Sequence, residues 1–198
     1  LIDTKVRMKT EISQIRSKST TDWDYLTSVS LEPQAFALSP DKKWIAYSDR
    51  SLDDDASLHL RSRGSDNVDR VLTDADSTGG LSFTPDSKTL FFSTLRVHDD
   101  YYKFMDLAAY RIDEDEEYFL TRGKRAFDPD VSPDGKQITY CLTRGLRTLI
   151  AVADLKEKEG KFHLENEKVL FNPPEYGKAS TPKFSVDSSK IIFSYHSP

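Results

Sequence analysis

Short runs of alternating apolar and polar residues recur along the chain. In each of four runs, an apolar residue and then a Ser or Thr precede an Asp, and further apolar residues follow that Asp after four and six positions. A spacing of two places both of the later side chains on one face of a β-strand. The segments are LSPDKKWIAYS from Leu38, FTPDSKTLFFS from Phe83, VSPDGKQITYC from Val131 and FSVDSSKIIFS from Phe184. Each segment predicts a strand with one buried face.

The residues around each Asp predict a tight turn that leads into this strand. Proline fixes φ near the value that a type I turn requires at its second position, and Asp can hydrogen-bond its own backbone. Gly135 adopts a positive φ without strain, but Lys42, Ser87 and Ser188 take its place in the other copies. Those three turns must either strain a non-glycine residue or use another turn type. The predicted structural turn residues are Pro40, Asp41, Pro85, Asp86, Pro133, Asp134, Gly135 and Asp187.

These segments are the landmarks of a longer repeat. The turn aspartates are separated by 45, 48 and 53 residues, periods that are typical of solenoids and propellers. A Leu-Thr pair precedes three of the turns, at Leu26, Leu72 and Leu120, and a weaker Leu-Phe pair at Leu170 precedes the fourth. Two more strands fit between successive landmarks, at 58–61 and 68–73, 107–112 and 118–121, and 149–155 and 167–171. Each repeat therefore holds about four strands, the content of one propeller blade.

The pattern apolar-Ser-Pro-Asp-Gly-Lys, with its Ile-x-Tyr/Phe strand and its Leu-Thr pair, resembles the TolB-like β-propeller repeat, a relative of the WD40 blade. The resemblance runs from about residue 24 to the end of the chain; DVSPDGKQITY matches it best, and FSVDSSKIIF, without Pro or Gly, matches it least. It implies a bacterial repeat protein with more than four blades. Such propellers serve as periplasmic or secreted binding platforms and as non-catalytic domains of serine peptidases.

The predicted fold is all-β, a β-propeller of four-stranded antiparallel blades that takes up residues 1–198. About four blades are visible, three of them complete and one split between the termini or truncated. In residues 1–28, Val6, Met8 and Ile12 alternate and WDYLT carries the Leu-Thr pair, so we expect the outer strands of a blade. The alternative is a short helix, which Ile12 and Ile15 suggest. The chain then forms either a closed ring of four blades or an arc of a larger propeller, which a second chain could complete.

Composition and charge narrow the classes of protein. A chain of 198 residues with 37% hydrophobic residues can bury a sizeable core. No apolar run approaches the roughly 18 residues of a membrane-spanning helix, so we expect no span. The net charge of −5 and the lack of a basic run argue against nucleic acid as a partner. Because the chain begins at Leu1 without a visible signal peptide, we expect a processed chain or part of a longer one.

The sequence predicts no catalytic residue, no metal ligand and no cofactor. The four histidines fall on different repeats without a His-x-x-x-His pair, and neither a Gly-x-Ser-x-Gly elbow nor a glycine-rich phosphate loop is present. The lone Cys141 replaces the Ser of the other repeats, and we expect a small packed side chain rather than a nucleophile. The acidic runs at 53–55 and 113–117 lack the spacing of a calcium loop and are expected to be solvated.

One segment combines aromatic and basic residues: LRVHDDYYKFMDL, from Leu95 to Leu107, between the second and third strands of the second repeat. We expect a loop here, on the same side of the propeller as the loops that follow the Leu-Thr pairs. Aromatic residues and Arg are enriched at interface hot spots. The candidate partner-binding residues are Arg96, His98, Tyr101, Tyr102, Phe104, Arg125 and Arg147. Alternatively, the aromatic residues cover the rim of their own blade or begin a long third strand.

The resulting hypothesis is a non-catalytic β-propeller that binds protein partners through its loops, located in the periplasm or secreted. The alternative is the propeller portion of a larger, prolyl-oligopeptidase-like peptidase, where it would gate or position substrate. A glycan or small ligand in the central channel is a third possibility.

Overall fold

Three consecutive units of four antiparallel strands make up most of the structure, a computed structural model that describes residues 10–15, 23–29, 35–49, 57–64, 68–73 and 80–198. The first two units are separate four-stranded sheets, and the third is part of a six-stranded sheet. The first blade contains β3 (Ala35–Leu38), β4 (Trp44–Asp49), β5 (Ser57–Ser62) and β6 (Asp69–Thr73). The second blade contains β7 (Ser82–Phe83), β8 (Thr89–His98), β9 (Tyr102–Arg111) and β10 (Glu116–Phe119). The third blade contains β11 (Ala126–Val131), β12 (Gln137–Arg144), β13 (Arg147–Lys158) and β14 (Lys161–Phe171). The expected four-stranded blades are thus confirmed.

Two further strand pairs flank these blades in the sequence. β15 (Lys178–Phe184) and β16 (Ile191–His196) pair with each other and join the third blade through a single parallel pair, Thr148 with Lys178. They correspond to the first two strands of a fourth blade. β1 (Thr10–Ile15) and β2 (Trp23–Val29) form an antiparallel pair that joins no other strand in the described part of the chain. The described residues of this segment are therefore strands rather than a helix, and their place in a blade stays a prediction.

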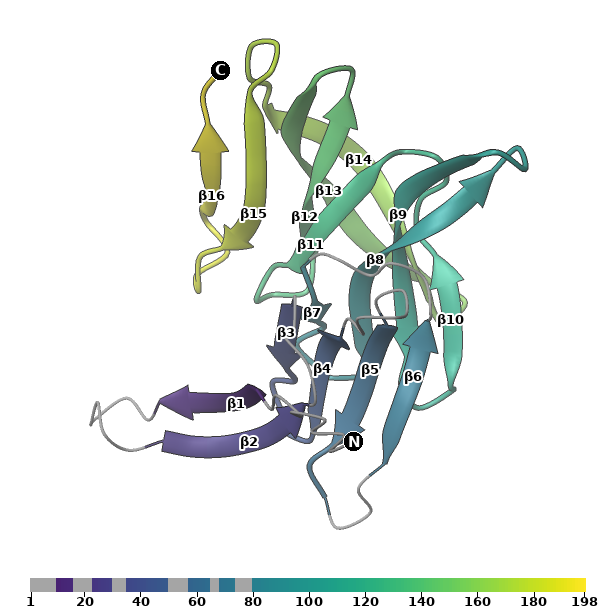
Figure 1. The fold of residues 1–198 in the computed structure, drawn as a ribbon, viewed down its shortest axis with the longest axis vertical. Helices are drawn as coiled ribbons and strands as arrows, with labels where there is room; N and C mark the ends of the chain where they lie inside the picture. Colours follow the sequence, from purple (N-terminus) through teal and green to yellow (C-terminus); the bar gives the residue numbers. More distant parts are fainter. Residues whose placement is uncertain (1–9, 16–22, 30–34, 50–56, 65–67, 74–79) are drawn as a thin grey trace, which may run out of the picture.

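The blades follow one another in chain order around a common centre (Figure 1). Their first strands lie toward that centre, and neighbouring first strands contact one another. A sheet that meets only its two neighbours in this radial order is the unit of a β-propeller. Among the described residues the blades form an open arc.

The turn around each Asp has the same hydrogen bonds in all four repeats. In the third repeat, Ser132 Oγ donates to Asp134 Oδ1 at 2.6 Å and accepts from Gln137 N at 2.9 Å, while Lys136 N donates to Asp134 Oδ1 at 3.1 Å. The turns at Asp41, Asp86 and Asp187 repeat these contacts. The hydrogen bond from Ser132, followed by that from Lys136 N, lowers the pKa of Asp134. The carboxylate is thus a structural acceptor that closes the turn.

The residue after each turn Asp has a left-handed backbone. Its φ is 63° at Lys42, 63° at Ser87, 71° at Gly135 and 60° at Ser188. Of the two alternatives for the non-glycine turns, the structure therefore shows the strained one, in which the turn type is kept. The hydrogen bonds of the Ser-x-Asp unit, which is Thr-x-Asp in the second repeat, hold the three L-residues in this conformation.

We expect Gly135→Ala to lower the free energy of unfolding by about 1 kcal/mol. The added Cβ would enter a backbone with φ of 71° and would lie 3.4 Å from Pro85 Cδ. The matched reverse change, Lys42→Gly, removes strain and is expected to leave stability unchanged or slightly higher. Urea unfolding of both variants measures the difference; equal losses in the two would contradict the assignment of strain.

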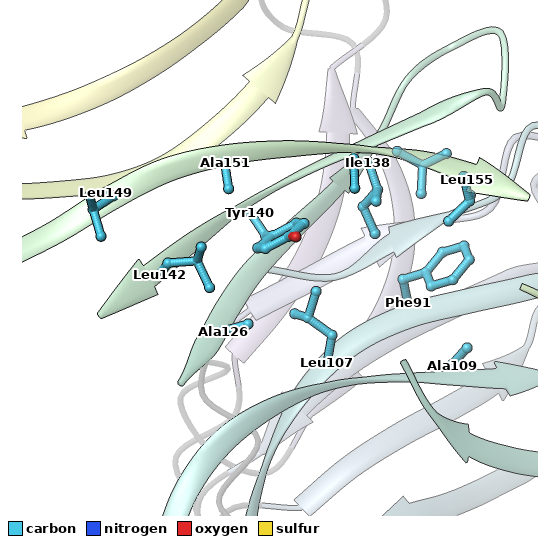
Figure 2. Packing of buried hydrophobic residues seen from close by; sticks show 12 residues of the cluster. Phe91, Leu107, Ala109, Ala126, Ile138, Tyr140, Leu142, Leu149, Ala151 and Leu155 are labelled. Atoms are coloured by element: carbon cyan, nitrogen blue, oxygen red, sulfur yellow. The ribbon is translucent and has the colours of Figure 1, made fainter. Parts of the chain in front are cut away.

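The core lies between adjacent blades. Figure 2 shows Tyr140 and Ile138 of β12 turned toward Phe91 and Leu107 of the second blade, and all four side chains are fully buried. The pattern residues that the sequence placed on a buried strand face are buried in the first three repeats and half-buried in the fourth: Ile45, Tyr47, Leu90, Phe92, Ile138, Tyr140, Ile191 and Phe193. Burial of these side chains in the second, third and fourth repeats holds each against the preceding blade, whereas Ile45 and Tyr47 pack on Leu38 of their own blade.

Carboxylates on β11 also tie the first strands together. Asp128 accepts from Gly80 N at 2.9 Å and from Thr181 N at 3.2 Å, so one side chain joins the two neighbouring repeats to the third blade. Asp130 accepts from Phe184 N at 2.8 Å. At Gly80 a Cβ would lie 3.1 Å from the Asp128 Cα, which explains why a residue without a side chain suits this contact.

Candidate protein-docking hairpin

The aromatic and basic segment of the second repeat is a β-hairpin. The expected loop is wrong except for its turn, and the alternative, a long third strand, is confirmed, because β9 begins at Tyr102. Strand pairing continues through Leu95 with Met105, Arg96 with Phe104 and His98 with Tyr102. Only residues 99–101 form a turn, and Asp99 and Asp100 there have left-handed φ values of 49° and 61°. In Figure 1 the tip of β8 and β9 projects beyond β10. Ring contacts of Phe104 with His98 across the hairpin and with Tyr102 along β9 stabilise this extension, although its polar residues suggest a loop.

Arg96, His98, Tyr102 and Phe104 share one face of the hairpin, because directly paired residues of antiparallel strands lie on the same side. The rings of Tyr102 and Phe104 are parallel, with an interplanar angle of 3° and centroids 6.0 Å apart. Arg125 follows β10 and places its guanidinium carbon 4.0 Å from the centre of the Phe104 ring. The structure thus brings these five predicted residues together.

A buried carboxylate anchors the base of the hairpin. Asp106 of β9 is fully buried and accepts hydrogen bonds from Thr121 Oγ1 at 2.7 Å, Gly123 N at 2.8 Å and Lys124 N at 3.2 Å. His98 Nε2 lies 2.8 Å from the second oxygen, Asp106 Oδ2. The network fixes the segment that leads to Arg125 against the hairpin. His98 therefore belongs to the anchoring network, and its Nε2 atom is engaged by Asp106 rather than available to a partner.

Large apolar side chains are exposed at the tip. Tyr101 is 86% exposed, Tyr102 60% and Val97 54%. Phe104 is half-buried beneath Arg125. Exposed apolar side chains gathered on one projecting element, rimmed by polar residues, are typical of interaction sites.

Arg147, the remaining predicted binding residue, lies elsewhere. It begins β13 in the third blade, and its Nη1 donates to Pro173 O at 3.3 Å. The sequence in turn gave no sign of Asp106, Val97 or Phe119 as members of this site. Thr121 was visible as the second residue of the Leu-Thr pair, and its hydroxyl contributes directly to the anchoring network.

The other candidate features provide no reactive centre within the described ranges. An open groove of about 470 Å³ lies between β13–β14 and β15–β16; its lining includes Ile150, Val152, Leu170, Phe171, Phe184, Ile191 and Phe193, with Lys168 and Lys190. Cys141 is fully buried, and desolvation raises the pKa of its thiol. The acidic run at 113–117 forms ion pairs with Arg70, Arg111 and Lys161, whereas 53–55 lies outside the described residues. No group of three or more His, Cys, Asp or Glu in the described part could hold a metal ion.

The blades, the cores between them and the shared turn define a β-propeller domain. The same architecture occurs in TolB from Acinetobacter baumannii, which aligns with a TM-score of 0.63 and 20% identity over 87% of this chain and 40% of that one. A putative TolB from Agrobacterium tumefaciens aligns with a TM-score of 0.59 and 18% identity over 89% of this chain and 74% of that one. A prolyl endopeptidase aligns with a TM-score of 0.58 and 15% identity over 85% of this chain and 27% of that one.

The chain therefore has a TolB-like β-propeller fold, and identities of this size show the fold alone. No family model and no curated protein matches the sequence. The chain spans 40% of the length of the Acinetobacter TolB. In the described part, no helix is long and apolar enough to span a membrane.

Proposed function

We propose that this propeller domain is a non-catalytic binding platform whose β8–β9 hairpin docks a protein partner. The exposure of Tyr101 and Tyr102 on a hairpin fixed at its base by Asp106 carries the proposal. Because the backbone is held in place before binding, these large side chains would contact a partner with little loss of conformational entropy. The resemblance to TolB supports a location in the periplasm or outside the cell.

The double variant Tyr101→Ser/Tyr102→Ser tests this function. We expect it to capture the partner from the native source at least about tenfold less efficiently, because interface hot spots are enriched in Tyr. Its free energy of unfolding should change by less than about 0.5 kcal/mol, since both side chains are exposed. Phe104 is left in place because it supports Arg125.

Tyr176→Ser is the matched control, because Tyr176 is as exposed as Tyr102, at 60%, and lies outside the hairpin. Capture by this control should equal that of the unchanged chain. The proposal fails if the double variant captures the partner normally, or if Tyr176→Ser loses capture to the same extent.

The second candidate function is the propeller portion of a peptidase, where the domain would gate or position substrate. The structural likeness to a prolyl endopeptidase favours it. A fluorophosphonate probe labels activated serines, so we would apply it to the protein from its native source and measure the mass of the labelled chain. A labelled parent chain that contains this sequence would support the peptidase; an unlabelled one would favour the binding platform.

A further inference from the structure

We infer that the partner of the β8–β9 hairpin presents carboxylate groups, which Arg96 and Arg125 bind. This inference rests on the proposed docking function of the hairpin. It names the chemistry of the partner: an acidic protein segment that also carries apolar side chains.

Both arginines are held against aromatic rings. The guanidinium carbon of Arg96 lies 4.1 Å from the centre of the Phe119 ring, and that of Arg125 lies 4.0 Å from the centre of the Phe104 ring. Arg96 and Phe104 are direct cross-strand partners, so Arg96 lies next to the residue on which Arg125 is stacked. Contact with a ring uses the face of a guanidinium group and leaves N–H groups at its edge to donate to a carboxylate in a bidentate pair.

Neither arginine has an acidic partner among the described residues. The exposed Arg122, which lies between them in the sequence, has none there either. Four other arginines of the blades do have one: Arg61 pairs with Asp69, Arg70 with Asp115, Arg111 with Glu114 and Arg144 with Glu167. Arg63 and Arg147 each donate to a backbone oxygen instead. The buried Asp106 at the base of the hairpin accepts its hydrogen bonds from other donors. Arg96 and Arg125 are therefore oriented cations whose donors remain available to a partner.

The surroundings favour a peptide carboxylate over the phosphates of a nucleic acid. Binding to a nucleic acid backbone relies on many cations along an extended surface, whereas this chain has a net charge of −5 and the hairpin site offers two oriented arginines. Tyr102, on the same face of the hairpin as Arg96, and Tyr101 in the adjoining turn add exposed apolar surface. An acidic segment with an apolar or aromatic residue complements both features.

The test uses peptides selected from a random dodecapeptide library on the full chain. We expect the selected peptides to be enriched in Asp and Glu next to apolar residues. Fluorescence anisotropy should then show that Arg96→Gln/Arg125→Gln weakens binding of a selected peptide by at least about tenfold, as for the loss of charge-assisted bidentate pairs. Replacing the acidic residues of the peptide by their amides should weaken it similarly. Arg63→Gln is the control, because Arg63 is exposed and its Nη1 donates only to a backbone oxygen, Lys42 O, at 3.1 Å.

The inference is overturned if the selected peptides are no more acidic than the library, or if Arg63→Gln weakens binding as much as the double variant. Tighter binding of a phosphoserine peptide or of single-stranded DNA would reassign the arginines to phosphate. If the tyrosine variant loses its partner but the selected peptides are not acidic, this inference fails and the docking function stands. If the tyrosine variant keeps its partner, the docking function fails, and the assignment of that partner to the arginines fails with it.

Discussion

Replacing Asp106 by Ala is expected to lower the free energy of unfolding by about 3 kcal/mol, because breaking a buried charged network by removing one partner leaves the others unsatisfied. Thr121 Oγ1, Gly123 N and His98 Nε2 would each lose a partner that lies within 2.8 Å. The carboxylate itself is fully buried, so water does not replace these contacts without a local rearrangement.

Asp106→Asn separates the charge of this side chain from its shape. An amide keeps one acceptor oxygen but turns two donors toward groups that themselves donate, so we expect an intermediate loss of about 2 kcal/mol. Asp100→Ala is the control, because that Asp is exposed in the turn, and it should change stability by less than about 0.5 kcal/mol. Urea unfolding gives the three values. Equal stability of Asp106→Ala and Asp100→Ala would show that the network contributes nothing.

The Asp106→Ala variant also tests whether the buried network positions the proposed binding site. The segment held by Asp106, Thr121 to Lys124, leads directly to Arg125, which stacks on Phe104. We therefore expect Asp106→Ala to lose binding of the selected acidic peptides even below its unfolding transition. A variant that is destabilised but binds normally would show that Arg125 is positioned by its ring contact alone.

The blades were predictable from sequence because their signals are local. The Ser-x-Asp turn is closed by side-chain and backbone contacts within five residues, and it recurs in phase with an alternating strand. Propeller blades also pack mainly on their neighbours, so a repeat that is recognised in the sequence fixes the order of the sheets in space. These features made the fold class visible without knowledge of any distant contact.

The β8–β9 hairpin was harder to predict because its stability comes from contacts between strands and segments. Arg96, His98 and Asp99 suggest a loop by composition, yet the first two pair with aromatic residues across the hairpin. Asp106 looks like one polar residue in a strand, and only the fold brings Thr121 to it. The sequence also grouped Arg147 with this site, because its loop was expected on the same side of the propeller. Loops on one side need not be neighbours, and Arg147 lies on another blade.

Phe91→Ala is expected to lower the free energy of unfolding by about 4 kcal/mol, the loss typical of a large aromatic side chain removed from a packed core. Phe91 is fully buried between the second and third blades, and its ring meets that of Phe162 edge-on, with centroids 5.4 Å apart and an angle of 65°. Phe91→Leu keeps most of the volume and should lose about 1.5 kcal/mol, whereas Phe119→Ala removes a ring that is 39% exposed and should cost less than Phe91→Ala.

The shape of the unfolding curve shows how the blades depend on one another. Because Phe91 belongs to the second blade while Tyr140 and Leu155 of the same core belong to the third, its loss weakens the contact that couples the two sheets. If the blades unfold as one cooperative unit, the Phe91→Ala transition moves to lower urea with an unchanged m-value. A second transition, or a clearly smaller m-value, would mean that the third blade keeps its structure after the second has unfolded, as nearest-neighbour coupling in repeat proteins allows. A midpoint equal to that of Phe119→Ala would contradict the assignment of Phe91 to the core between these blades.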